Sequence, residues 1–310
     1  MKHQWFRLCL LCLFCTTLIS AQDYEAGLKA CQAGDYAAAL DHFKPLAEQG
    51  HAGARFQLGH MYLQGDGVRK DTAEALKWFR MAAGQGNADA QLNLGFLYAE
   101  GRGVSQDYRE AAKWLRMAAE QGNANAQFNL GVMYGNGQGV EQDSREAVQW
   151  YHMAAEQGYP NAQFNLGLMY DSGQGVPRDY QEAAKWYRLA AEQGYASAQF
   201  NLGFLYDDGQ KIQRDYREAV KWYRMAAEQG DRDAQLNLGF MYANGRGVPQ
   251  DYVEAHKWYN LAAVGGNSAA VNNRDMLAAK MTAEQIAEAQ RLAREWKPTE
   301  NARAEPPGAH

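Results

Sequence analysis

The sequence predicts an all-α protein, an α/α solenoid of about six full helical hairpins of 36 residues each, with capping helices at both ends. The first observation is a row of tryptophans at a constant step of 36 residues: Trp78, Trp114, Trp150, Trp186, Trp222 and Trp258. The second is a row of glycines at the same step: Gly59, Gly95, Gly131, Gly167, Gly203 and Gly239. A fixed period of roughly 20–50 residues is typical of solenoids, because each unit buries its apolar face only against its neighbours.

Residues 87–122 show why each unit is expected to be a pair of helices. Asn87 is a candidate N-cap, and apolar residues such as Leu94 and Leu97 follow at helical spacing. A turn with two glycines, Gly101 and Gly103, comes next, and glycine accepts the positive φ that such a turn needs. The unit therefore predicts a first helix that ends at a glycine turn.

The second helix of the unit is expected to begin at Asp107, with Glu110 completing a capping box and Gly122 ending the helix. The same Asp and Glu pair recurs in the other units: Asp71 and Glu74, Asp143 and Glu146, Asp179 and Glu182, Asp215 and Glu218, Asp251 and Glu254. The tryptophan that follows is expected to wedge between adjacent units, and a ligand-stacking platform is the alternative.

Length and composition would ordinarily indicate one or two globular domains, but the repeat indicates one continuous array. The formal net charge is −5. Because phosphate contacts need a net basic face, nucleic acid is not an expected partner.

Residues 1–21 are expected to be a signal peptide that is cleaved near Ala21. Lys2 and Arg7 precede a short apolar run, which is too short to span a bilayer as a helix, and small residues follow it. An uncleaved anchor is the alternative. The expected location is periplasmic or secreted, without stable membrane insertion after cleavage.

Cys31 would be the one cysteine left after cleavage, so no intrachain disulfide is expected. Its side chain is expected to be a partly buried small apolar group, with intermolecular pairing or a free reactive thiol as the alternatives.

The chain is expected to divide further into a degenerate capping repeat (22–50), the repeat array (51–266), C-terminal capping helices (267–297) and a disordered tail (298–310). The first of these keeps the cap Asp35 and the aromatic Phe43, but Pro45 falls inside its second helix, where it removes a hydrogen bond. At the other end, Arg274 and Asp275 stand where the units have leucine and glycine, so the seventh unit is expected to stop after one helix.

The units share the pattern A-x-x-x-L-G-x-x-Y-x-x-G-x-G-V-x-x-D-x-x-E-A-x-K-W-x-x-x-A-A-E-Q-G. This pattern resembles the Sel1-like repeat, a relative of the tetratricopeptide repeat, over about residues 52–266. The resemblance implies a right-handed superhelix that serves as an adaptor for other proteins. It also implies export, with roles in the bacterial envelope or in host contact.

The fifth unit departs from this pattern, because Lys211 and Ile212 replace the second turn glycine and the valine. A reshaped loop is expected there, with a specialised contact as the alternative.

The sequence contains no G-x-S-x-G elbow, P-loop or H-E-x-x-H motif, and no histidines paired at the spacing of metal ligands. We therefore expect no catalytic residues, metal or cofactor. The candidate protein-binding residues are amides on the first helices: Asn93, Asn129, Asn165, Asn201, Asn237, Gln127, Gln163 and Gln199. A carboxamide both donates and accepts, so a row of amides suits the backbone of an extended peptide. A ladder of bonds between units is the structural alternative.

The second helices carry a basic row, which includes Lys113 and Arg116. It is expected to be a solvated outer face, because acidic residues lie within one turn, and an anionic glycan or lipid surface is the alternative.

The leading hypothesis is a non-enzymatic scaffold that binds a protein segment on the concave surface of the solenoid. An envelope hydrolase acting on peptidoglycan or β-lactams, as ascribed to cysteine-rich relatives, is one alternative, although this chain lacks their paired cysteines. An inhibitor or immunity-type partner of one enzyme is the other.

Overall fold

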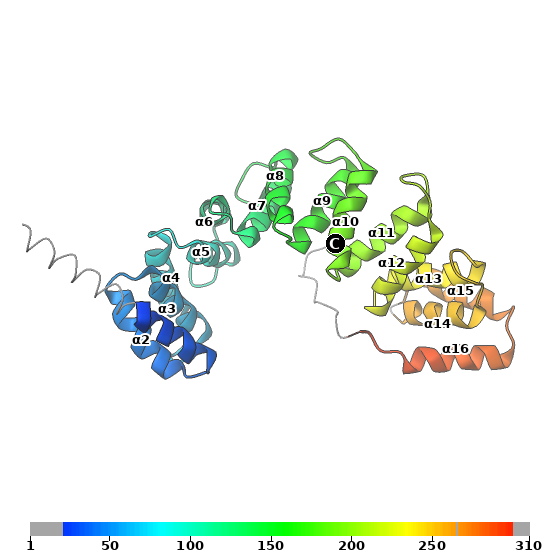
Figure 1. Ribbon diagram of the computed structural model, residues 1–310, viewed down its shortest axis with the longest axis horizontal. Coiled ribbons are helices and arrows are strands. Elements are labelled where there is room, and N and C mark those ends of the chain that lie inside the picture. Colours follow the sequence, from blue (N-terminus) through cyan, green and yellow to red (C-terminus); the bar gives the residue numbers. More distant parts are fainter. Residues whose placement is uncertain (1–20, 265, 300–310) are drawn as a thin grey trace, which may run out of the picture. The chain divides into compact units, whose positions relative to one another are not determined.

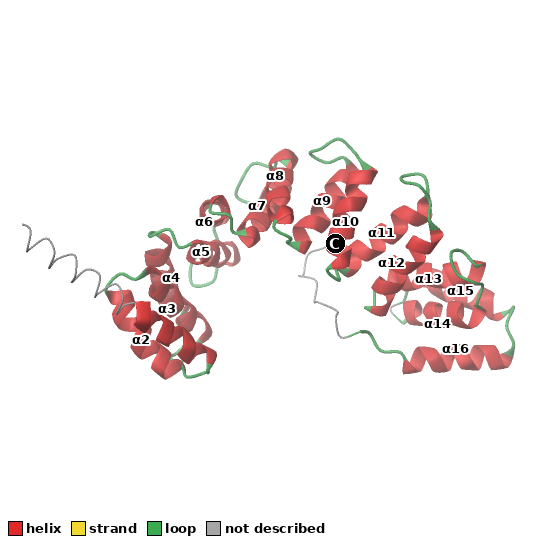
Figure 2. Cartoon of the chain, viewed as in Figure 1, coloured by secondary structure: helices red, strands yellow, loops and turns green. Residues whose placement is uncertain are grey.

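The computed structural model describes residues 21–264 and 266–299, and the described residues contain helices and turns without any strand (Figure 2). Residues 21–32 are helical. The helices that follow are α2 (Tyr36–Glu48), α3 (Ala52–Gln64), α4 (Thr72–Ala83), α5 (Ala88–Glu100), α6 (Tyr108–Glu120), α7 (Ala124–Asn136), α8 (Ser144–Glu156), α9 (Pro160–Ser172), α10 (Tyr180–Glu192), α11 (Ala196–Asp208), α12 (Tyr216–Glu228), α13 (Arg232–Asn244), α14 (Tyr252–Ala263), α15 (Ser268–Ala278) and α16 (Ala283–Glu295).

Successive helices form hairpins, for example α5 with α6 and α11 with α12, and the second helix of each of these hairpins also packs on the first helix of the next (Figure 1). This arrangement is the predicted α/α solenoid. The chain forms two compact units, with the boundary between Trp150 and Tyr151, and each unit is described by itself below.

The predicted helix ends are confirmed in residues 87–122. The side chain of Asn87 accepts the backbone N–H of Ala90 at 2.8 Å, so Asn87 is the N-cap of α5. Gly101 and Gly103 have φ values of 68° and 72°, in the left-handed region that favours glycine. The carboxylate of Asp107 accepts the backbone N–H of Glu110 at 3.0 Å at the start of α6.

Of the two hydrogen bonds in the predicted Asp and Glu capping box, in contrast, only the one accepted by the aspartate side chain forms. The backbone N–H of Asp107 donates to the carbonyl of Tyr98 at 2.9 Å, so it has no need of the Glu110 side chain. Glu110 instead pairs with Lys113, one turn later, at 2.7 Å. The five equivalent aspartates donate to the equivalent tyrosine carbonyls: Tyr62, Tyr134, Tyr170, Tyr206 and Tyr242. The full reciprocal box occurs at α16, where Thr282 and Gln285 form it as predicted.

The tryptophans lie at the seams between hairpins, as the packing interpretation predicts. Within the second unit, Trp222 of α12 is 2% exposed and packs in one cluster with Tyr187 and Leu202 of the preceding hairpin junction. Within the first unit, Trp114 packs against the cluster that contains Phe79 and Leu94. Each of these indoles closes the core that the preceding helices leave open.

The glycine inside each first helix allows close packing against a large side chain of the second helix. A Cβ added at Gly167 would lie 2.6 Å from the ring of Tyr187, and one at Gly95 would lie 2.6 Å from Leu115. Real Cβ contacts are longer than this, so the glycine row is a packing requirement of the hairpin.

The first repeat keeps the hairpin form in spite of its divergent sequence. Asp35 caps α2, Phe43 is fully buried, and α2 continues through Pro45 to Glu48. Cys31 is a free, half-buried cysteine beside the Phe43 cluster, as expected for a small apolar group.

Two groups of expectations fall on residues that the structure does not describe: the signal segment, and the tail beyond Thr299. Within the described residues, no helix is long and apolar enough to cross a membrane.

Candidate functional site

The glutamine row is buried and joins successive hairpins to one another. Gln163 is 3% exposed, and its amide donates to the carbonyl of Ala155 at 3.1 Å and accepts the amide of Gln193 at 2.8 Å. Gln199 donates to Ala191 at 3.0 Å in the same way. The other buried members, Gln91, Gln127 and Gln235, each donate to the carbonyl eight residues earlier. The glutamines, including the candidates Gln127, Gln163 and Gln199, therefore form a ladder inside the protein and are closed to a peptide.

The asparagine row is half-buried and lies on the outer edge of the first helices. Asn93 and Asn129 each donate to a backbone carbonyl one turn earlier in their own helix, at 2.8 Å. In the second unit, Asn165 bonds to the hydroxyl of Tyr151, which partly offsets the rise in the pKa of that tyrosine to about 12 by burial. The asparagine amides are thus partly exposed and also form hydrogen bonds within the protein.

Asn201 and Asn237 stand in the same relation to the next two tyrosines, Tyr187 and Tyr223, whose pKa values burial also raises. The Tyr187 hydroxyl is buried and has no hydrogen-bond partner in good geometry among the described residues, although Asn201 lies close to it. These hydroxyls bring polar groups to the inner side of the asparagine row.

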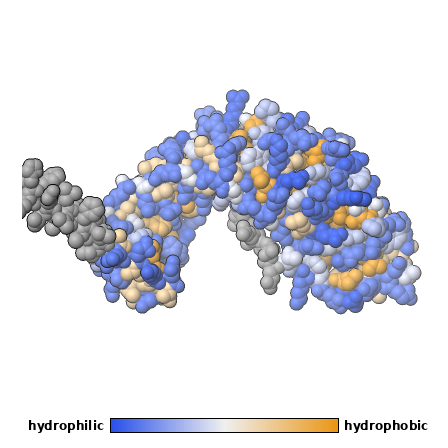
Figure 3. Space-filling view, viewed as in Figure 1, coloured by the Kyte–Doolittle hydropathy of each residue, from blue (hydrophilic) through white to orange (hydrophobic). Residues whose placement is uncertain are grey.

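A row of exposed apolar residues was missed by the sequence analysis. It lies three residues after each asparagine, and in the second unit its members are each more than a third exposed: Leu168 (38%), Phe204 (43%) and Phe240 (37%). Residues three apart on a helix are neighbours, so each apolar side chain lies beside an asparagine. The usable sequence signal is a phenylalanine or leucine that recurs off the buried stripe. Figure 3 shows apolar areas in orange, scattered within a largely hydrophilic surface.

We call the surface formed by this apolar row and the asparagine row of α9, α11 and α13 the first-helix face of the second unit. It carries four carboxylates, on Asp171, Asp207, Asp208 and Asp233, and one cation of its own helices, on Arg232, and the cations of Lys211 and Arg246 lie over its Phe204 and Phe240 rings. It therefore combines apolar, amide and acidic groups, which suits a polypeptide segment better than a small uncharged ligand.

The basic row of the second helices is neutralised by its own neighbours. Lysines pair with the glutamate three residues earlier, as Lys185 does with Glu182 at 2.5 Å and Lys257 with Glu254 at 2.8 Å. The arginines bond to a tyrosine of the next hairpin, as Arg80 does to the hydroxyl of Tyr98 at 2.7 Å. The solvated outer face is the better description of this row.

Lys211 makes the specialised contact that was the alternative at the fifth turn. No residue other than glycine has positive φ among the described residues, so the loop changes its path at Lys211 and avoids the strained conformation. The Lys211 ammonium lies 2.9 Å from the carboxylate of Asp171 and 5.0 Å from the ring centroid of Tyr180. The loop is both reshaped and bound to the first-helix face.

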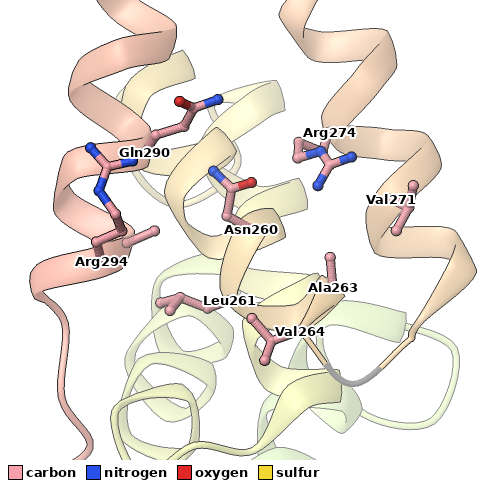
Figure 4. A pocket seen from close by; sticks show the side chains of 9 residues that line it. Asn260, Leu261, Ala263, Val264, Val271, Arg274, Gln290 and Arg294 are labelled. Carbon is pink, nitrogen blue, oxygen red and sulfur yellow. The ribbon is translucent and has the colours of Figure 1, made fainter.

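A separate cavity of about 510 Å³ lies at the C-terminal end, between α14, α15 and α16. Arg274 of α15 and Arg294 of α16 line it on either side of Asn260 and Leu261 of α14 (Figure 4). The cavity exists because α16 packs on α14 rather than on α15. At Asp275, a side chain occupies the position where the other hairpins need glycine, so α15 cannot accept a second helix in the usual way.

No group of three or more histidine, cysteine or acidic side chains is arranged to hold a metal ion in the part of the chain that the structure describes. The buried His256 has its pKa lowered by burial and bonds to Asn260, four residues later in α14. Its position is that of a packed side chain.

The hairpin array and its exposed first-helix face define an α/α repeat protein that offers an extended surface. The sequence pattern of the Sel1 repeat matches seven successive segments, 23–51, 52–87, 88–123, 124–159, 160–195, 196–231 and 232–267, and the chain belongs to the Sel1 repeat family. Such proteins are generally non-enzymatic scaffolds for protein–protein interaction.

Two solved structures illustrate the similarity. A Sel1 repeat protein from Oxalobacter formigenes is 34% identical with a TM-score of 0.66, over 77% of this chain and 96% of that one. A protective antigen present in uropathogenic Escherichia coli strains is 29% identical with a TM-score of 0.52, over 89% of this chain and 84% of that one. No curated protein matches the chain.

Proposed function

We propose that this protein is a non-enzymatic scaffold that binds a segment of another protein along the first-helix face of the second unit. The observation that carries the proposal is the row of exposed apolar side chains beside the asparagine row. Phe204 and Phe240 are 43% and 37% exposed although they recur at a fixed place in the hairpin. Large apolar groups that recur in the open are typical of interaction surfaces.

On each first helix, the apolar side chains and the asparagine amides would make different contributions to binding. The apolar side chains supply buried area when a partner covers them, at roughly 25 cal/mol per Å². The asparagine amides are placed to satisfy the backbone groups of the partner, which would otherwise be desolvated without a bond. The partner is therefore expected to be a polypeptide segment with apolar side chains.

The test is a capture experiment from extract of the native host, with two matched double variants. Phe204→Ser with Phe240→Ser removes two exposed apolar groups from the first helices, and Leu189→Ser with Met225→Ser removes two groups of 43% and 36% exposure from the second helices. We expect a partner that wild type and the second-helix variant recover and the first-helix variant loses. Recovery of every partner by a folded first-helix variant would reject the proposal.

We also propose that the protein is exported to the periplasm or beyond, on the strength of the charged start and apolar run of residues 1–21. Mass spectrometry of the protein from a periplasmic or culture fraction is expected to find an N-terminus near Gln22. A chain that retains Met1 and stays with the cytoplasmic fraction would contradict export.

A further inference from the structure

Two successive junctions of the second unit carry the same set of side chains. In the first, between α9, α10 and α11, the set is Asp171, Tyr180 and Phe204, and the ammonium of Lys211 occupies it. Its nitrogen is 2.9 Å from the Asp171 carboxylate, 5.0 Å from the Tyr180 centroid and 5.6 Å from the Phe204 centroid. A carboxylate with two ring faces is a recognised way to hold a basic side chain.

One hairpin later, Asp207, Tyr216 and Phe240 take the same three places. The guanidinium of Arg246 lies over both rings, 5.5 Å from the Tyr216 centroid and 4.9 Å from the Phe240 centroid. It forms no ion pair with Asp207, whose carboxylate has no such partner within 4.0 Å among the described residues. The second junction therefore has its rings covered and its carboxylate unpaired.

Asp207 is half-buried, and the one hydrogen bond that its carboxylate accepts among the described residues is long, 3.5 Å from the hydroxyl of Tyr223. Burial raises the pKa of Asp207 and outweighs the attraction of Arg246 and Arg214, which act in the opposite direction. A partly buried carboxylate that no cation contacts directly costs folding free energy, and an added cation in contact would recover part of that cost.

We propose that Asp207 binds a lysine or arginine side chain of the protein segment that lies along the first-helix face. The internal Lys211 shows how closely a cation approaches the equivalent carboxylate, 2.9 Å at Asp171. At the Asp207 junction Arg246 already covers the two rings, so the side chain of the partner contacts the carboxylate alone. Because Phe204 lies one turn before Asp207 on α11 and Phe240 lies on the neighbouring α13, the segment carries an apolar residue next to the basic one. Of the two equivalent carboxylates, Asp171 already has its cation and Asp207 has none within ion-pair distance among the described residues, which favours a basic side chain at Asp207.

Lys211 has a second consequence, because it closes the Asp171 junction to any partner. Replacing it with glutamine leaves Asp171 unpaired and provides a second site for a basic side chain, one hairpin away from the first. Asp207→Asn and Lys211→Gln, two substitutions on the same face, should therefore change the affinity for a basic segment in opposite directions. This inference rests on the proposed function, since both place the partner on the first-helix face.

The test uses the purified chain and a labelled, end-blocked peptide of alternating leucine and lysine, with the same peptide carrying glutamine for lysine as the neutral probe. Binding is followed by fluorescence anisotropy at low salt. We expect wild type to bind the lysine probe more tightly than the neutral one. Asp207→Asn should weaken the affinity for the lysine probe about fivefold or more and leave the affinity for the neutral probe unchanged. Lys211→Gln is expected to tighten the lysine probe.

Glu192→Gln is the matched control, because it removes the same charge from an exposed position on α10, a second helix. It is expected to leave both probes unchanged. Equal weakening by Asp207→Asn and Glu192→Gln would overturn the inference and assign the effect to net charge. No preference of wild type for lysine over glutamine would overturn it too.

The capture experiment separates the failure of this inference from that of the proposed function. A partner lost by the Phe204 and Phe240 double variant but fully retained by Asp207→Asn would overturn the role of Asp207. It would leave the first-helix face standing as the docking surface.

Discussion

Replacement of Gln163 by alanine is expected to destabilise the second unit, because this amide joins two hairpins inside the protein. The change removes the bond to the Ala155 carbonyl at 3.1 Å and the bond from the Gln193 amide at 2.8 Å. Each intramolecular bond contributes about 1 kcal/mol net. The lost methylene packing at a site that is 3% exposed adds to this loss, so we expect about 2–3 kcal/mol in total.

A loss of about 2–3 kcal/mol corresponds to a fall in Tm of about 4–12 °C for a protein of this size. Circular dichroism during heating and in urea measures it. Gln163→Met separates the two contributions, because methionine keeps most of the volume and loses both bonds. A Gln163→Met protein within about 0.5 kcal/mol of wild type would refute the ladder as a source of stability.

Three further changes test other parts of the account. Trp222→Ala should cost about 3–5 kcal/mol in urea unfolding, because the indole is 2% exposed at a seam; an unchanged midpoint would contradict the wedge. Gly139→Ala should destabilise far more than Gly122→Ala, since a Cβ at Gly139 would lie 2.1 Å from the Tyr108 carbonyl oxygen whereas nothing lies within 4 Å at Gly122; equal melting temperatures would contradict this. Asp207→Asn should stabilise the protein at neutral pH, because burial raises the pKa of this carboxyl and ionised Asp207 opposes folding. Melting curves should show the gain vanish as the pH falls below the raised pKa of Asp207, and a gain that is equal at acidic and neutral pH would contradict the assignment.

The hairpin architecture was predictable because the repeat period and the helix caps can be recognised from the residue types alone. Asn87 and Asp107 cap helices through short-range geometry, and that geometry depends on neighbours along the chain. The failure at Glu110 has a tertiary cause. The Asp107 N–H donates to the Tyr98 carbonyl across the turn, and only the folded hairpin brings these two groups together.

The candidate site was harder to predict because burial separates residues of the same chemistry. Gln163 and Asn165 lie two residues apart with the same functional group, yet one faces the interior and the other the edge of the first helix. The exposed row that includes Phe204 was missed because an apolar residue in a repeat is normally assigned to the core. Its exposure follows from the helix phase relative to both neighbours, and that phase appears only when the hairpins are stacked.

Site-specific photo-crosslinking in the native host locates the docking surface on the folded protein. A benzophenone amino acid placed at Phe204 reports on the first-helix face, and one placed at Met225 reports on a second helix of similar exposure, 43% against 36%. The account predicts a partner adduct from position 204 and none from position 225. An adduct from position 225 alone would contradict it.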